Sequence, residues 1–206
     1  MNYLFDNPDK VLPFFWEHLS LTFGSLLIAL CIALPLGLLI AKYKKLQAPV
    51  TSVLGVIYTI PSMALYAALI PYTGLGVTTA TIGLVAYAQM ILVRNVVAAI
   101  RGIDPMMIEA AKGMGMSKSQ IVFKIEIPLS VPVVIAGIRV ATVSIISIGT
   151  IAAWIGAGGL GRLIFQGLNQ DHTGKIIAGT VTIAVLAIGA DLLFRVLEKI
   201  LSPRLN

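Results

Sequence analysis

Long uninterrupted apolar stretches constrain this chain more than any other feature of its sequence. A bilayer core about 30 Å thick needs about 20 apolar residues of helix, at about 1.5 Å per residue. Backbone groups in hydrocarbon must be hydrogen-bonded internally, so each stretch of that length is expected to be a helix. The sequence therefore predicts an all-α membrane protein, a single domain over residues 1–206. Its five transmembrane helices are expected at about 19–41, 50–72, 76–93, 129–155 and 176–197.

The composition excludes a soluble chain. Apolar residues make up 58% and charged residues 12%, whereas soluble domains are about half apolar and about a quarter charged. One cysteine and two widely separated histidines provide neither a disulfide nor the spacing of a metal site. We expect no metal, no catalytic residue and no soluble domain, so any enzymatic motor must lie on another chain.

Basic residues predict the orientation. Eleven of the 15 lysines and arginines fall in the segment after the first stretch, the segment after the third, and the carboxyl-terminal tail. The positive-inside rule makes that side cytoplasmic, which places the amino terminus outside and the carboxyl terminus inside. The net charge of +6 is thus explained by membrane topology, and we expect no nucleic-acid partner.

The cytoplasmic segment 94–128 is long and has a helical pattern of its own. Asp104 and Pro105 are typical of an N-cap and a first helical residue. Ser117 is a plausible cap for a second short helix that ends before Pro128. Glycines follow the first helix, and glycine accepts the left-handed conformation of a C-cap. The apolar face of that helix consists of Met106, Met107, Ala110, Ala111 and Met114.

This segment resembles the EAA loop of ABC importer permeases. The resemblance rests on the spacing of Glu109, Ala110, Ala111, Gly115, Ile125 and Pro128, with Ile127 where the family pattern has leucine. It implies a coupling helix that docks on a cytoplasmic ATP-hydrolysing subunit, which carries the ATP and magnesium. An ordinary amphipathic surface helix would explain the apolar face but not the full spacing.

Three further stretches resemble osmoprotectant permeases, the subunits that import glycine betaine, carnitine and choline. They are residues 58–65 (YTIPSMAL), 136–139 (AGIR) and 155–161 (IGAGGLG). The resemblance implies the inner membrane of a prokaryote and an extracytoplasmic substrate-binding protein. Methionine importer permeases are similar in span count, which leaves methionine or another amine as an alternative substrate. Arg162 stands where relatives often carry an acidic residue.

The glycine-rich stretch with Gly156, Gly158, Gly159 and Gly161 matches a dinucleotide-binding pattern only by coincidence. That pattern needs a buried strand before it and an acidic residue about 20 positions later, and this sequence provides neither. The glycines predict close backbone approach, either to a docked binding protein or across a gate. A simple helix-ending turn is the alternative.

Two ionisable residues lie inside apolar stretches. Charges in lipid are costly and usually face protein or water. Arg139 and Asp191 are expected at similar depths, which favours an ion pair between the fourth and fifth helices. A role in gating is the alternative.

The second apolar stretch contains Pro61, which removes a backbone hydrogen bond and is expected to kink the helix. Tyr58, Tyr66 and Tyr87 offer π faces that attract a quaternary ammonium group. These four residues are candidates for the translocation path, although membrane tyrosines are more often packing residues.

ATP-binding subunits act in pairs, and this chain offers one coupling loop. We therefore expect a second permease, identical or homologous, with substrate crossing between the two. A secondary carrier would show inverted repeats and ion ligands at the membrane centre. A membrane anchor without transport activity is the other alternative.

Overall fold

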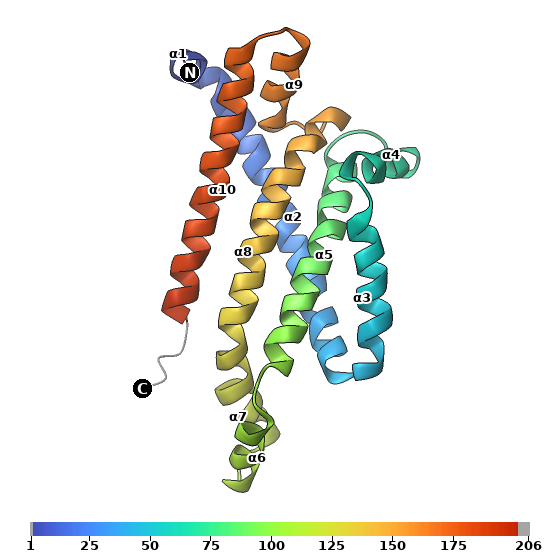
Figure 1. The fold of residues 1–206 in the computed structure, drawn as a ribbon, viewed down its shortest axis with the longest axis vertical. Coiled ribbons are helices and arrows are strands. Elements are labelled where there is room, and N and C mark those ends of the chain that lie inside the picture. The colour runs from blue at the N-terminus through green and yellow to red at the C-terminus, as the bar shows by residue number, and fades with distance from the viewer. Residues whose placement is uncertain (1, 202–206) are drawn as a thin grey trace.

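Four long helices carry the fold of the computed structural model, which describes residues 2–201. They run along its long axis (Figure 1), and each is long and apolar enough to cross a bilayer. Arg204, one of the tail cations, lies outside the described residues. The four helices are α2 (Pro8–Lys42), α5 (Val77–Arg101), α8 (Ile127–Ala152) and α10 (Thr173–Leu201).

Two of these helices extend well beyond the apolar stretches that predict them. Helix α2 begins at Pro8 rather than near residue 19, and α5 continues to Arg101 rather than ending near residue 93. Apolar length marks only the part of a helix that needs hydrocarbon. The extension of α2 is held by packing, because Val11 is buried against Leu160 and Leu163, which lie just before and within α9 (Gly161–Asn169). A short helix, α1 (Asn2–Asp6), precedes it.

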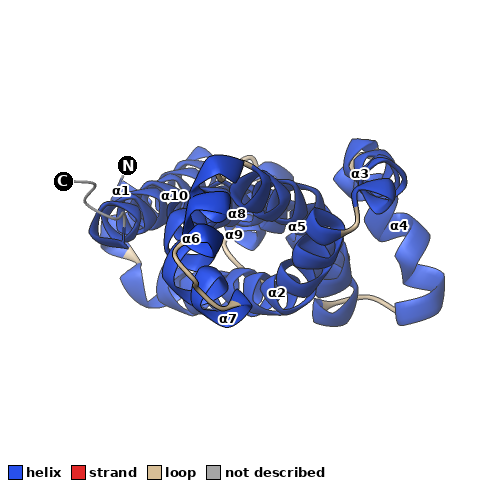
Figure 2. Ribbon diagram, turned by 90° about the horizontal axis from the view of Figure 1, so that it is seen from below, coloured by secondary structure: helices blue, strands red, loops and turns tan. Residues whose placement is uncertain are grey.

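The second predicted helix is broken in two. Helix α3 (Lys44–Thr59) and α4 (Ser62–Thr73) meet at an angle of 98°. Pro61 has no backbone N–H to donate, and it forces the preceding Ile60 into an extended conformation, with ψ 128°. The expected kink is thus a complete break. Residues 2–201 contain four helices that are long and apolar enough to span a membrane, or five spans if the bent pair counts as one. Figure 2 shows α3 and α4 at one side of the bundle.

Small residues allow the central helices to approach closely. Helix α5 packs against both α2 and α8. A Cβ atom at Gly37 of α2 would lie 2.6 Å from the Val96 side chain of α5. A Cβ at Gly137 of α8 would overlap the Asn95 side chain, as expected where a small residue brings two membrane helices together.

Short elements occupy the two ends of the bundle. At one end, α6 (Pro105–Gly113), α7 (Lys118–Ile121) and the π-helix η1 (Val122–Glu126) lead directly into α8. At the other end, the 3₁₀-helix η2 (Ala153–Ile155) and a glycine-rich loop lead into α9 (Gly161–Asn169). Figure 1 shows the two sets of elements at opposite ends of the long axis.

Candidate functional site

The predicted coupling segment folds as two capped helices. The Asp104 side chain accepts a hydrogen bond from the Met106 backbone N–H at 2.8 Å, and Pro105 is the first residue of α6. Ser117 and Gln120 form a reciprocal capping box at the start of α7. These bonds satisfy backbone donors that a helix leaves unpaired at its amino end. Both caps therefore agree with the sequence prediction.

Gly115 ends α6 in a Schellman motif. Its backbone N–H donates to Lys112 O at 2.9 Å, and the N–H of Met116 donates to Ala111 O at 3.0 Å. This motif needs a left-handed residue at the position after the cap, and Gly115 has φ +82°. No atom lies within 4 Å of the position where a Cβ would stand. Backbone conformation, rather than intramolecular contact, therefore requires glycine here.

The coupling segment leaves several of its large apolar side chains exposed. Met106 is 70% exposed, Met114 75% and Phe123 70%. Ala111 of α6 and Ile121 of α7 are buried, and the two helices contact each other. Ile125 lies half-buried in η1, and Pro128 is at the start of α8. Flexible methionines on an exposed helix face are typical of a surface that binds another protein.

Glu109 and Ala110 are exposed, and Glu109 borders a hollow beside the coupling segment. The hollow measures about 560 Å³. Its other charged lining residues are Lys44, Arg101, Lys112 and Glu126. Arg101 does more than line it, because its guanidinium donates to Ile40 O at 2.9 Å and to Ala41 O at 3.4 Å. An arginine on the last carbonyls of a neighbouring helix satisfies acceptors that the helix leaves open. Arg101 thus anchors the end of α5, just before α6, to the end of α2.

At the opposite end, the glycine-rich loop is held on α2. Gly156, Gly158 and Gly159 have φ values of +80°, +84° and +81°. The backbone N–H of Gly159 donates to Glu17 Oε2 at 2.9 Å. A Cβ at Gly158 would lie 2.5 Å from the same carboxylate oxygen. The loop backbone thus approaches α2 of the same chain closely, whereas its approach to a binding protein or across a gate stays a prediction.

Below the loop, His18 is completely buried. Its Nε2 lies 3.1 Å from the Ile146 carbonyl of α8, and a Cβ at Gly159 would lie 2.9 Å from its Nδ1. A Cβ at Gly161 would overlap the Thr150 carbonyl. Glu17 and His18 were not expected from the sequence, because their contacts with the loop and with α8 join residues 142 and 128 positions apart.

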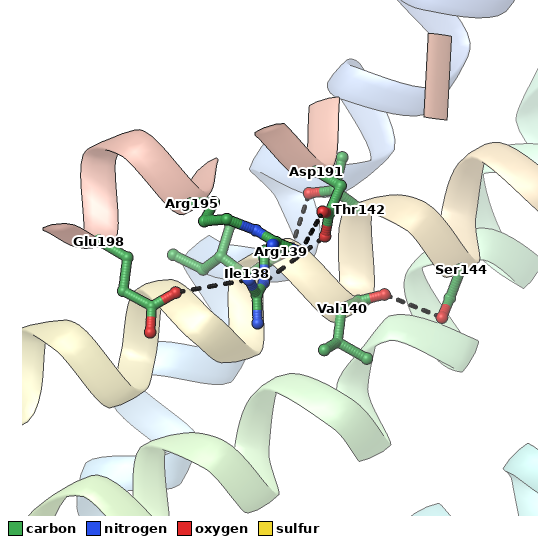
Figure 3. A network of polar contacts seen from close by, with 8 residues as sticks. All are labelled: Ile138, Arg139, Val140, Thr142, Ser144, Asp191, Arg195 and Glu198. Carbon is green, nitrogen blue, oxygen red and sulfur yellow. Dashed lines mark hydrogen bonds and ion pairs between the residues drawn. The ribbon is translucent and has the colours of Figure 1, made fainter. Parts of the chain in front are cut away.

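Arg139 and Asp191 lie together, within a larger network of charges. Arg139 Nε is 3.6 Å from Asp191 Oδ1, and Arg139 Nη1 is 3.7 Å from Glu198 Oε2. Arg195, one helical turn after Asp191, donates to its other carboxylate oxygen at 3.0 Å. Figure 3 shows the four side chains gathered between α8 and α10. The sequence predicted a single pair, Arg139 and Asp191. In the structure, Glu198 also contacts Arg139, and Arg195 also contacts Asp191.

The four candidate residues of the translocation path have different environments. Tyr66 is completely buried, and its ring lies where a Cβ at Gly83 would stand. The Tyr87 hydroxyl donates to the Ile60 carbonyl that the break at Pro61 leaves free. Tyr58 is 42% exposed and lies edge-to-face with Tyr87, the ring centroids 6.0 Å apart. Tyr66 and Tyr87 are thus buried within the chain, and of the three tyrosines only Tyr58 presents a large exposed surface.

Sequence comparison identifies relatives along the whole chain. The family model for the binding-protein-dependent transport system inner membrane component matches residues 33–206. The carnitine transport permease protein OpuCB of Listeria monocytogenes is 36% identical over 199 residues, which cover 97% of this chain and 91% of the relative. The choline transport system permease protein OpuBD of Bacillus subtilis (strain 168) is 39% identical, with 98% and 90% covered.

The fold is also that of a solved importer. A chain of the MetNI methionine ABC transporter, in an inward-facing native crystal form, superimposes with a TM-score of 0.84. It is 23% identical, and the alignment covers 94% of this chain and 96% of that one. At this identity the likeness establishes the fold alone. From the family match and the relatives, the chain belongs to the binding-protein-dependent transport system inner membrane components, the multi-pass permease subunits of ABC importers.

Proposed function

We propose that this chain is the permease of an importer for quaternary ammonium osmoprotectants such as glycine betaine, carnitine or choline. The observation that carries the proposal is full-length similarity to a group of relatives with one kind of substrate. A third relative, 39% identical over 98% of this chain, is the glycine betaine/carnitine/choline transport system permease protein OpuCD of Bacillus subtilis. ATP and magnesium belong to a separate ATPase subunit.

The coupling segment is the proposed docking site for that ATPase. Its exposed methionines and Phe123 would be covered by a groove on the partner, and removing apolar surface from water favours association. This assignment makes the α6–α7 end cytoplasmic and the glycine-loop end extracytoplasmic. It agrees with the basic residues, which are concentrated towards the α6–α7 end.

Two further partners complete the proposed transporter. A second permease, identical or homologous, would present the second coupling segment to the paired ATPases, and substrate would cross between the two permeases. A substrate-binding protein would deliver ligand at the glycine-loop end.

Reconstitution of the complete complex in lipid vesicles tests the function. We expect glycine betaine, carnitine or choline, with the binding protein, to stimulate ATP hydrolysis and to accumulate inside. Stimulation by methionine, with none by any quaternary amine, would overturn the substrate assignment.

Site-directed labelling tests the orientation. After Cys31→Ser removes the native thiol, a cysteine at position 112 should react with an impermeant reagent only from the cytoplasm. A cysteine at position 172 should react only from outside. The reverse pattern would refute the topology and the docking site together.

A further inference from the structure

A hollow of about 550 Å³ lies between residues 17–28 of α2, the start of α5 and the glycine-rich loop. It lies at the end of the bundle opposite the coupling segment, where the proposed orientation places the binding protein. Ligand pockets in proteins measure about 300–1,000 Å³ and combine apolar walls with a few polar groups. The polar side chains that line this hollow are Glu17, Ser20, Ser25, Thr81 and Arg162.

The hollow holds opposite charges that do not neutralise each other. Within residues 2–201, no ion pair joins Glu17 and Arg162. The Arg162 guanidinium instead lies over the Phe14 ring, 5.8 Å from its centroid. Each charge is therefore available to a ligand, with the carboxylate attracting a cation and the guanidinium an anion.

One residue fixes both charged residues relative to each other. Gly159 donates its N–H to the Glu17 carboxylate at 2.9 Å and accepts a bond from the Arg162 backbone N–H at 3.0 Å. The glycine conformation of the loop, φ +81° at this residue, makes this double contact possible. The loop backbone thus holds the Glu17 carboxylate and the Arg162 backbone on the same residue.

A buried hydroxyl in the hollow has no partner. Ser25 is 1% exposed, and its Oγ makes no hydrogen bond within the described part of the chain. Buried polar atoms are nearly always paired with protein, water or ligand. Ser25 therefore supplies an open hydrogen-bonding position on the wall of the hollow.

We propose that this hollow binds a small zwitterion, with its quaternary ammonium group near Glu17 and its carboxylate on Arg162. The inference rests on the proposed function and extends it, because it assigns part of the ligand selection to the permease. Glycine betaine and carnitine carry both charges, whereas choline carries only the cation. Choline thus leaves Arg162 without a counterion and is repelled by it, so the hollow favours the zwitterions.

Two substitutions should shift selectivity in opposite directions. Uptake of labelled glycine betaine and choline is measured with the complete complex and the same binding protein throughout. Arg162→Gln removes the carboxylate's partner and the repulsion of choline, so the betaine-to-choline uptake ratio should fall by about two- to fivefold. Glu17→Gln removes choline's attractive charge but keeps an oxygen that accepts from Gly159, so the ratio should rise.

Two controls isolate charge from structure. Arg162→Lys keeps the positive charge and should keep most of the wild-type ratio. Asp9→Asn removes an exposed charge from α2, the helix that carries Glu17, at a position outside the hollow. It should leave the ratio unchanged.

The remaining outcomes count against the proposal. Equal losses of both substrates in the two variants would mean that the hollow docks the binding protein, and unchanged ratios would mean that it binds no solute. A wild-type complex that imports neither compound would instead refute the proposed function, and the zwitterion site with it.

Discussion

The glycine-rich loop and the coupling segment use glycine for opposite reasons. In the loop, Gly158 and Gly159 press against Glu17 and His18 of α2, so that a side chain would meet atoms of the same molecule. In the coupling segment, Gly115 has the same left-handed conformation but an empty surrounding space. The loop glycines thus pack against their own chain, whereas the space around Gly115 is open to another molecule.

This difference separates residues that maintain the fold from residues that serve an interface. At the loop end, the residues that contact the loop include His18, which is completely buried. The coupling end leaves Met106 and Met114 at least 70% exposed. Substitutions at the closely packed loop glycines should therefore reduce stability, and those on the exposed face of the coupling segment should reduce transport while the fold remains intact.

The largest effect is expected for Gly161→Ala. The new methyl group would overlap the Thr150 carbonyl, and a backbone atom cannot turn aside as a side chain can. Overpacking typically costs about 1–3 kcal/mol, and we expect at least the upper value. Thermal unfolding of the purified complex measures it. Gly156→Ala is the control, because that glycine has open space and should cost only about 1 kcal/mol of backbone strain. Equal losses in the two variants would show that close packing against the end of α8 is not what requires glycine at position 161.

Gly115→Asp should abolish uptake and leave the helices inserted. The strain at positive φ is about 1 kcal/mol, too small to unfold the bundle, but it would turn the Met106–Met114 face away from the ATPase. Uptake should fall at least tenfold, and ATPase retention on the purified complex should decrease. Gly113→Asp adds the same charge two residues earlier, at a glycine without positive φ. Normal uptake with full ATPase retention in Gly115→Asp would exclude the coupling role.

The charges between α8 and α10 test a contact midway between the two ends. Arg139→Ala and Asp191→Ala should each destabilise the complex, and the double variant should lose less than the sum. We expect a coupling free energy of about 0.5–1 kcal/mol, as for partly exposed pairs. The side chains are 24% and 32% exposed, and Asp191 retains Arg195 when Arg139 is removed. Additive losses in thermal unfolding would mean that the pair contributes nothing.

Glu109→Ala should give the smallest effect. Its side chain is exposed beside Lys112 and Arg101, and an exposed ion pair with a partner contributes less than about 1 kcal/mol. We expect uptake to fall by about twofold with unchanged stability. A loss as complete as that of Gly115→Asp would assign Glu109 the main role at the interface instead.

Local signals in the sequence predict much of this structure. The N-caps at Asp104 and Ser117 and the left-handed glycine that ends α6 depend on neighbouring residues, and all three are present. The apolar stretches predict the four long helices because bilayer thickness fixes a minimum length.

Apart from the Arg139–Asp191 pair, which the similar depths of two charges in apolar stretches predict, the long-range contacts could not be predicted from the sequence. The bond between Glu17 and Gly159 joins residues 142 positions apart, and no local pattern marks either residue as a partner. Pro61 predicts a bend, but its 98° angle depends on where Tyr87 meets the freed Ile60 carbonyl. Arg195 and Glu198 share the Arg139–Asp191 network because the crossing of α8 and α10 brings their turns together, and that crossing is set by side-chain packing along both helices.

The continuity of α7, η1, α8 and η2 has a mechanical consequence. Residues Lys118–Ile155 form 38 residues of unbroken helix, a rod about 57 Å long at about 1.5 Å per residue. Its midpoint is at Gly137, where a Cβ atom would overlap the Asn95 side chain of α5. A displacement of α7 by a bound partner would therefore be passed along one continuous helix to Ile155 and the loop that follows it.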